Sequence, residues 1–150
     1  MGSCEYDKIV ASTIDFKDLA KMNKILIAPC GMNCGICRAY LRKTRKCLGC
    51  RIDSLDKLPT RANCAIKICQ KLKSCESGFC FECIDYPCSR IKRLDKRYRT
   101  KYSMSMVENL ASIKGNGLLT FIDNEKKRWG CSKCGGIICV HDGCCFDCGN

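Results

Sequence analysis

Near its C-terminus the chain carries two short cysteine motifs, Cys131-Ser-Lys-Cys134-Gly135 and Cys145-Phe-Asp-Cys148-Gly149, with ten residues between Cys134 and Cys145. Two thiolates on one tight turn occupy adjacent corners of a tetrahedron, so two such turns supply the four sulfur ligands of a structural zinc ion. The glycine after the second cysteine of each motif lets backbone N–H groups approach the sulfur. The spacing therefore predicts a zinc ribbon over residues 131–150, with the ligands Cys131, Cys134, Cys145 and Cys148.

Three residues between these motifs, Cys139, His141 and Cys144, have no assigned role. His141 is the one histidine of the chain, and an exposed turn position beside Asp142 is as compatible with the sequence as a ligand role. We therefore leave His141 out of the predicted ligand set.

Cysteine is dense again in residues 30–88. The metal ligands predicted there are Cys30, Cys34, Cys37, Cys47, Cys50, Cys64, Cys69, Cys80, Cys83 and Cys88. One partition joins the pair Cys34/Cys37 to Cys47/Cys50, at a short zinc-knuckle spacing, and joins Cys64/Cys69 to Cys80/Cys83. Interleaved ligation leaves other pairings open, and Cys30, Cys75 and Cys88 have no place in this partition. With the ribbon, these sites would hold about three zinc ions.

The chain contains 18 cysteines, a density that indicates disulfides in an oxidising compartment or metal sites in a reducing one. The N-terminal residues include acids and lack the basic and apolar regions of a secretory signal. We therefore expect a cytoplasmic protein whose thiolates bind metal. The longest apolar stretch, Ile25–Ala28, is far shorter than the roughly 20 residues of a membrane span, so no membrane partner is expected.

Iron–sulfur chemistry is the alternative to zinc in the N-terminal cluster. Cys30, Cys34 and Cys37 have the C-x3-C-x2-C spacing that binds a [4Fe–4S] cluster in radical enzymes using S-adenosylmethionine. Those enzymes need a barrel-sized domain after the motif, and this chain is too short to provide one. A cluster without radical chemistry, with Cys88 as the fourth ligand, remains open.

The middle of the chain has no cysteine and shows helical patterns instead. Ser89–Tyr98 predicts an amphipathic helix. Ser105-Met-Val-Glu108 has the form of a capping box, which predicts a helix over about residues 106–114 that stops at Gly115. Leu118–Trp129 predicts a third helix.

The remaining segments predict only short elements. Lys24–Pro29 predicts a short strand, and residues 36–43 and 65–73 have brief helical patterns. Residues 15–22 predict a brief helix capped by Asp15. A segment of about 60 residues as poor in core residues as 30–88 needs metal to fold.

These patterns predict a small metal-stabilised α+β fold, with short helices and knuckles around metal sites, a helical middle and a C-terminal zinc ribbon. The expected division is an N-terminal extension at 1–23, a cysteine-rich metal-cluster domain at 24–88, a helical segment at 89–130 and a zinc-ribbon module at 131–150.

The formal net charge of +12 indicates an anionic partner. A four-thiolate zinc site carries about −2, so three such sites would lower the net charge to about +6. Cations alternate with Tyr98 and Tyr102 in a basic stretch that fits phosphate contact and base stacking. A solvated helix face explains the stretch better, because Leu94 and Asp95 interrupt the run of cations. The candidate partners are a nucleic acid or an acidic protein, and the candidate contact residues are Lys92, Arg93, Arg97, Arg99 and Lys101.

Common catalytic motifs are missing from the sequence: it has no H-E-x-x-H, no G-x-S-x-G and no phosphate-binding glycine loop. Thiols committed to metal are poor nucleophiles, so hydrolytic or transfer chemistry is disfavoured. The sequence favours a multi-zinc binding or adaptor module. The alternative is an iron–sulfur protein in electron transfer, redox sensing or metal handling.

Four motifs together resemble domain-of-unknown-function family 3795, a cysteine-rich group. They are Ala28–Cys37, Lys46–Cys50, Gly78–Cys88 and Leu94–Tyr102, and residues 131–149 are similar to the knuckles of a longer subgroup. The family has no established activity, so the resemblance implies metal binding and no specific role. It also implies a cysteine where this chain has Arg61, as the first member of a C-x2-C-x4-C triplet with Cys64 and Cys69.

Overall fold

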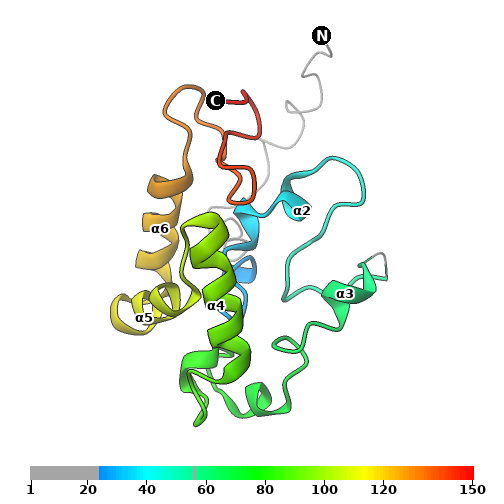
Figure 1. Ribbon diagram of the computed structural model, residues 1–150, viewed down its shortest axis with the longest axis vertical. Coiled ribbons are helices and arrows are strands. Elements are labelled where there is room, and N and C mark those ends of the chain that lie inside the picture. Colours follow the sequence, from blue (N-terminus) through cyan, green and yellow to red (C-terminus); the bar gives the residue numbers. More distant parts are fainter. Residues whose placement is uncertain (1–23, 56) are drawn as a thin grey trace, which may run out of the picture.

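The computed structural model describes residues 24–55 and 57–150 (Figure 1). Its helical elements are η1 (Cys34–Ile36), α2 (Arg38–Leu41), α3 (Pro59–Ala62), η2 (Gln70–Ser74), η3 (Cys80–Glu82), α4 (Ser89–Tyr102), α5 (Met106–Asn116) and α6 (Leu118–Trp129). The predicted extension at 1–23 and the predicted helix at 15–22 lie outside the described residues.

The predicted α+β class is confirmed only in part, because the described residues are mostly helical. The β structure of the described residues is limited to three isolated bridges, such as the one between Ile27 and Asn33. The predicted strand over residues 24–29 is wrong, since the chain reverses at once. Ala28 N–H donates to the Met32 carbonyl at 2.8 Å, and Gly31 takes a φ of 85° in the turn between them.

The three long helices of the middle segment are close to their predicted bounds. The Ser105 hydroxyl accepts from Glu108 N at 3.0 Å, which confirms the predicted cap of α5. α5 ends at Asn116 before Gly117, whose φ is 84°. α4 extends past its predicted end and stops at Ser103, which has a left-handed backbone. α5 packs against both α4 and α6, and the three lie together in Figure 1.

One core joins these helices to the cysteine-rich segment. Met106 and Leu110 of α5 are completely buried, and they share a cluster with Ile27, Ile36 and Phe121. Burial of one such side chain contributes about 1.5–3 kcal/mol. The Asn109 side chain donates to the Gly31 carbonyl at 3.0 Å, and this bond holds the turn that contains Cys30 against α5.

The cysteine-rich segment itself contains only short helices, in contrast to the longer ones beside it. The pattern at 36–43 forms the single turn α2, and the pattern at 65–73 forms turns followed by η2. Elements this short have little helical stability of their own. No helix of the described residues combines the length and apolarity needed to cross a membrane.

Candidate metal centres

The C-terminal four-cysteine group, made of Cys131, Cys134, Cys145 and Cys148, has the geometry of a single-ion site. Its sulfur atoms all lie within 4.8 Å of one another. Cys131 Sγ is 3.7 Å from Cys148 Sγ, and Cys134 Sγ is 3.5 Å from Cys145 Sγ. Four sulfurs bound at about 2.3 Å to one tetrahedral ion stand about 3.8 Å apart. The group therefore fits one tetrahedral metal ion.

Backbone turns position these four sulfurs. Gly135 N donates to the Cys131 carbonyl and Gly149 N to the Cys145 carbonyl, each at 2.9 Å. Gly135 and Gly149 have φ values of 75° and 76°, a conformation that side chains disfavour. Gly136 N lies 3.3 Å from Cys134 Sγ and donates to it. The glycines therefore close the turns, and the amide that reaches sulfur belongs to the following residue.

The surroundings of two of these cysteines, Cys131 and Cys148, favour the thiolate, the form that binds metal. The side chain of Asn150, whose Nδ2 is 3.4 Å from Cys148 Sγ, lowers the pKa of the Cys148 thiol to about 6. Backbone N–H groups of Cys134 and Lys133 lower the pKa of Cys131.

Residues 139–142 dock the C-terminal segment onto η1 and α2. Val140 N donates to the Ile36 carbonyl at 3.0 Å. The guanidinium of Arg38 pairs with the Asp142 carboxylate, to which its Nε donates at 3.1 Å. Figure 1 shows the C-terminal segment (red) beside the part of the chain that carries η1 and α2.

His141 belongs to this docking contact, outside the four-cysteine group. Its Nδ1 accepts from Arg38 N at 3.4 Å, so its Nε2 is free to donate to the Tyr98 hydroxyl, 3.0 Å away. Tyr102 also packs edge-on against the imidazole ring. Burial lowers the pKa of His141, which favours this neutral form.

Six of the ten predicted N-terminal ligands line one hollow of about 420 Å³, which we call the large cysteine cavity. They are Cys30, Cys34, Cys37, Cys47, Cys50 and Cys64. Cys50 N donates to Cys34 Sγ at 3.4 Å. A hydrogen bond with Cys34 and the nearby cations Lys57 and Lys67 lower the pKa of Cys50 to about 6, whereas burial raises that of Cys30 to about 12.

The other four predicted ligands line a separate hollow of about 30 Å³, which we call the small cysteine cavity. They are Cys69, Cys80, Cys83 and Cys88. Cys80 opens η3, Cys83 follows it, and Cys88 immediately precedes α4. The structure thus separates Cys64 from Cys69, which the sequence had joined, and places Cys88 away from the triplet at Cys30–Cys37.

The two cavities differ from the C-terminal group in how their sulfurs are spaced. Across residues 24–55 and 57–150, only the C-terminal group places three or more metal-binding side-chain atoms all within 4.8 Å of one another. All 17 cysteines of these ranges are free thiols. Cys75, which had no predicted partner, lines neither cysteine cavity; its Sγ lies 3.5 Å from the Lys71 carbonyl. Cys139 is completely buried.

Cations on the wall of the large cysteine cavity were not anticipated from the sequence. Arg38, Arg42, Arg61 and Arg97 all line it. Arg61, which stands where the family resemblance implies a cysteine, therefore faces a group of thiols. Scattered arginines carry no spacing pattern, so only the fold reveals that they converge.

The five predicted nucleic-acid contacts all lie on α4 and are exposed, and two of them also face other groups of the protein. Lys92, Arg93 and Lys101 are exposed along α4. Arg99 instead pairs with Asp95, with Nε 2.8 Å from the carboxylate, and Arg97 lies at the large cysteine cavity. The rings of Tyr98 and Tyr102 pack on His141, which occupies the surfaces predicted to stack on bases.

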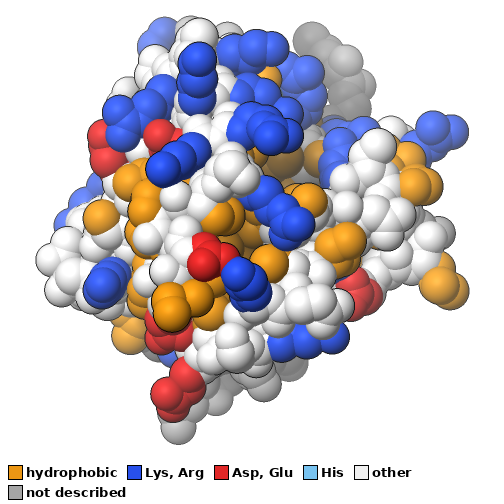
Figure 2. Space-filling view, turned by 60° about the horizontal axis from the view of Figure 1, so that its bottom comes forward, with side chains coloured by type: hydrophobic (Ala, Val, Ile, Leu, Met, Phe, Trp, Pro, Cys, Tyr) orange, Lys and Arg blue, Asp and Glu red, His pale blue; other side chains and the backbone are white. Residues whose placement is uncertain are grey.

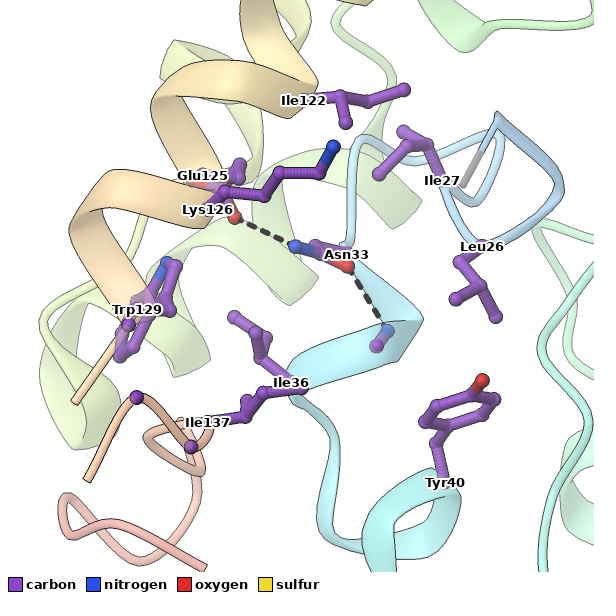
Figure 3. Close-up of a pocket in the computed structure, with 14 residues that line it drawn as sticks. Leu26, Ile27, Asn33, Ile36, Tyr40, Ile122, Glu125, Lys126, Trp129 and Ile137 are labelled. Carbon is purple, nitrogen blue, oxygen red and sulfur yellow. Dashed lines mark hydrogen bonds between the residues drawn. The ribbon is translucent and has the colours of Figure 1, made fainter. Parts of the chain in front are cut away.

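A third cavity of about 350 Å³ lies between η1, α6 and the C-terminal segment (Figure 3). Asn33 donates to the Glu125 carboxylate at 3.2 Å and accepts from Gly35 N at 3.0 Å. Burial raises the pKa of Glu125. The wall of this third cavity contains no cysteine. A single glutamate in an amphipathic helix carries no sequence signal of burial, which is why Glu125 was not anticipated.

Comparison with known proteins gives one match. The sequence model of the family described as "Protein of unknown function (DUF3795)" matches residues 26–93. No curated protein and no solved structure matches the chain. The family match ends before the C-terminal four-cysteine group, so the resemblance of residues 131–149 to a longer subgroup stays a prediction. The cysteine-rich part of this chain, residues 26–93, is therefore similar to the DUF3795 family of proteins of unknown function.

Proposed function

We propose that this chain is a multi-metal protein in which bound metal builds a binding module, and that the C-terminal four-cysteine group holds one zinc ion. The observation that carries this proposal is the clustering of four sulfurs within 4.8 Å. Four thiolates at tetrahedral spacing suit zinc. Because all four positions of the ion would be filled by protein, the site is structural, with no open position for a substrate.

The zinc ion would act on the docking contact next to it. The residues that dock the C-terminal segment, from Cys139 to Asp142, lie between the two cysteine turns. A segment this short has almost no core of its own, and structural zinc supplies about 10–16 kcal/mol of apparent folding energy. Zinc would thereby hold Val140 and His141 against η1, α2 and α4.

An acidic protein surface is the partner class best supported. Lys and Arg side chains spread over the face shown in Figure 2, around a hollow with hydrophobic side chains. Base stacking loses support because Tyr98 and Tyr102 pack on His141. A fluorescent single-stranded oligonucleotide should therefore bind weakly even at low salt. Tight binding that weakens steeply with salt would favour the nucleic acid instead.

The zinc proposal is tested by metal analysis of protein purified without oxygen. We expect Cys148→Ser to lose one zinc ion per chain relative to the unmodified protein. Cys144→Ser is the matched control, because Cys144 lies in the same segment but outside the four-cysteine group. Cobalt loaded into the zinc-free protein should show the intense visible bands of a tetrahedral thiolate site. An unchanged zinc content in Cys148→Ser would overturn the proposal.

A further inference from the structure

We propose that the small cysteine cavity binds one [4Fe–4S] cluster, separate from the C-terminal zinc ion. This inference deepens the proposed function, since it rests on the cysteines of this chain being metal ligands. It assigns one set of four ligands: Cys69, Cys80, Cys83 and Cys88.

The ligand count agrees with a cubane cluster. A [4Fe–4S] cluster takes one cysteine thiolate for each of its four irons, and four cysteines line this cavity. Three of them form a C-x2-C-x4-C run from Cys80 to Cys88, so one short segment supplies three of the four lining cysteines. Cys69 comes from the preceding loop. Arg61 and Cys64 line the large cysteine cavity instead, so the arginine at position 61 removes no ligand from this set.

The arrangement of the sulfurs separates this site from a zinc site. Four ligands of one ion must approach to about 3.8 Å, as those of the C-terminal group do. No three sulfurs of the small cysteine cavity form such a compact group, although the four cysteines all line one hollow of about 30 Å³. In a cubane each thiolate binds a different iron, so its four sulfurs stand farther apart and enclose the inorganic core.

The wall of the cavity suits a buried cluster. Ile66 and Ile91 are buried, and with Leu72 and Tyr86 they line the spaces between the cysteines. An apolar wall excludes the water and oxygen that degrade such clusters, and it tunes their potential.

The N-terminus of α4 also favours an anionic group at this position. Cys88 is the N-cap residue of this 14-residue helix, and the positive end of a helix dipole stabilises negative charge. A [4Fe–4S] cluster with four thiolates carries such charge. Arg90 lines the same cavity, and its Nη1 donates to the Ala65 carbonyl at 3.0 Å, which ties α4 to the loop that carries Cys69.

The experiment uses the full chain, purified without oxygen and reconstituted with ferrous iron and sulfide. We expect an absorbance band at about 400 nm and about four irons per chain at this site. Cys83→Ala should lose this band while keeping the zinc of the C-terminal group. The matched control is Cys75→Ala, a cysteine of the same segment that does not line the cavity, and it should keep the band.

A second variant places the cluster, and circular dichroism shows that each variant is folded. Cys47→Ala changes only the large cysteine cavity, so it should keep the band of the small one. Loss of the band in Cys47→Ala together with its retention in Cys83→Ala would place the cluster in the other cavity and overturn the assignment. A reconstituted protein without the band, or with zinc bound by these four cysteines, would also overturn it. Neither result bears on Cys148→Ser, whose zinc content tests the proposed function alone.

Discussion

Replacement of Asp95 tests how the helical middle is held together. Asp95 of α4 is 9 % exposed, and its Oδ1 accepts from the Ser105 hydroxyl at 2.7 Å and from Val107 N at 3.0 Å. The two donors lie at the start of α5, where helix amides need an acceptor. Arg99 pairs with the other carboxylate oxygen. One buried carboxylate therefore joins the N-terminus of α5 to the side of α4.

The magnitude follows from which of these bonds is shielded. Hydrogen bonds to a charged group contribute about 1.5–3 kcal/mol each, and an unsatisfied buried amide costs a similar amount. The Arg99 side chain is 53 % exposed, so its ion pair adds at most about 1 kcal/mol. We expect Asp95→Ala to lower the free energy of unfolding by about 3–5 kcal/mol. Asp95→Asn, which keeps an acceptor for both donors, should cost about 1–2 kcal/mol.

The assay is urea unfolding at pH 7 followed by the fluorescence of Trp129, the one tryptophan of the chain. Asp123→Asn is the control: the side chain of Asp123 is 67 % exposed and faces Lys126 at 3.8 Å, so its loss should cost less than about 0.5 kcal/mol. Burial alone would raise the pKa of Asp95, but the bonds from Val107, Ser105 and Arg99 lower it. Its stabilisation is therefore complete above the unfolded pKa of about 3.9 and is lost as the pH falls through the lower folded value. A cost for Asp95→Ala no larger than that of Asp123→Asn would refute this reasoning.

Two further substitutions test the turns and the third cavity. Gly135→Ala places a side chain at a φ of 75°, where no neighbouring atom lies within 4 Å. We therefore expect this variant to lose about 1–2 kcal/mol of stability and to release zinc more readily to a chelator. Gly115→Ala is the control within α5 and should stabilise the protein by about 0.5–1 kcal/mol. Glu125→Gln should raise the melting temperature at pH 7, because burial raises the pKa of Glu125 and ionisation of its carboxyl therefore opposes folding. The wild-type carboxyl is protonated in acid, so the gain should disappear as the pH falls toward about 4.3. A variant that melts at a lower temperature than the wild type at pH 7 would contradict this account.

The long helices were predictable because their determinants are local. Ser105 and Glu108 specify the start of α5, and the apolar positions of Leu118–Trp129 specify α6 to the residue. The strand predicted at 24–29 failed because the chain reverses at Gly31, and Ile27 and Ala28 are buried in a core shared with residues of α5 and α6. The β propensity of an isolated apolar run cannot distinguish burial in a sheet from burial against helices.

The clustering of the four C-terminal cysteines was predictable for the same reason, and the partition of the N-terminal cysteines was not. Each C-terminal pair lies on one turn, so spacing alone brings its sulfurs together. Cys64 and Cys69 are five positions apart yet line different cavities, while Cys64 and Cys30 share one. Such a partition depends on how loops cross in space, and no spacing rule contains that information.

The placement of His141 links the C-terminal segment to the cysteine-rich segment. The residue lies between the two C-terminal cysteine turns, yet its ring lines the large cysteine cavity beside Tyr98 and Cys37. The C-terminal segment therefore supplies part of the wall of a cavity whose cysteines all precede residue 65. Because that segment has few core contacts of its own, the zinc ion proposed for the C-terminal four-cysteine group would also determine whether this wall is in place. Removal of zinc should thus increase the reactivity of cysteines in the large cavity, with Cys37 and Cys47 alkylated faster than Cys69 and Cys83.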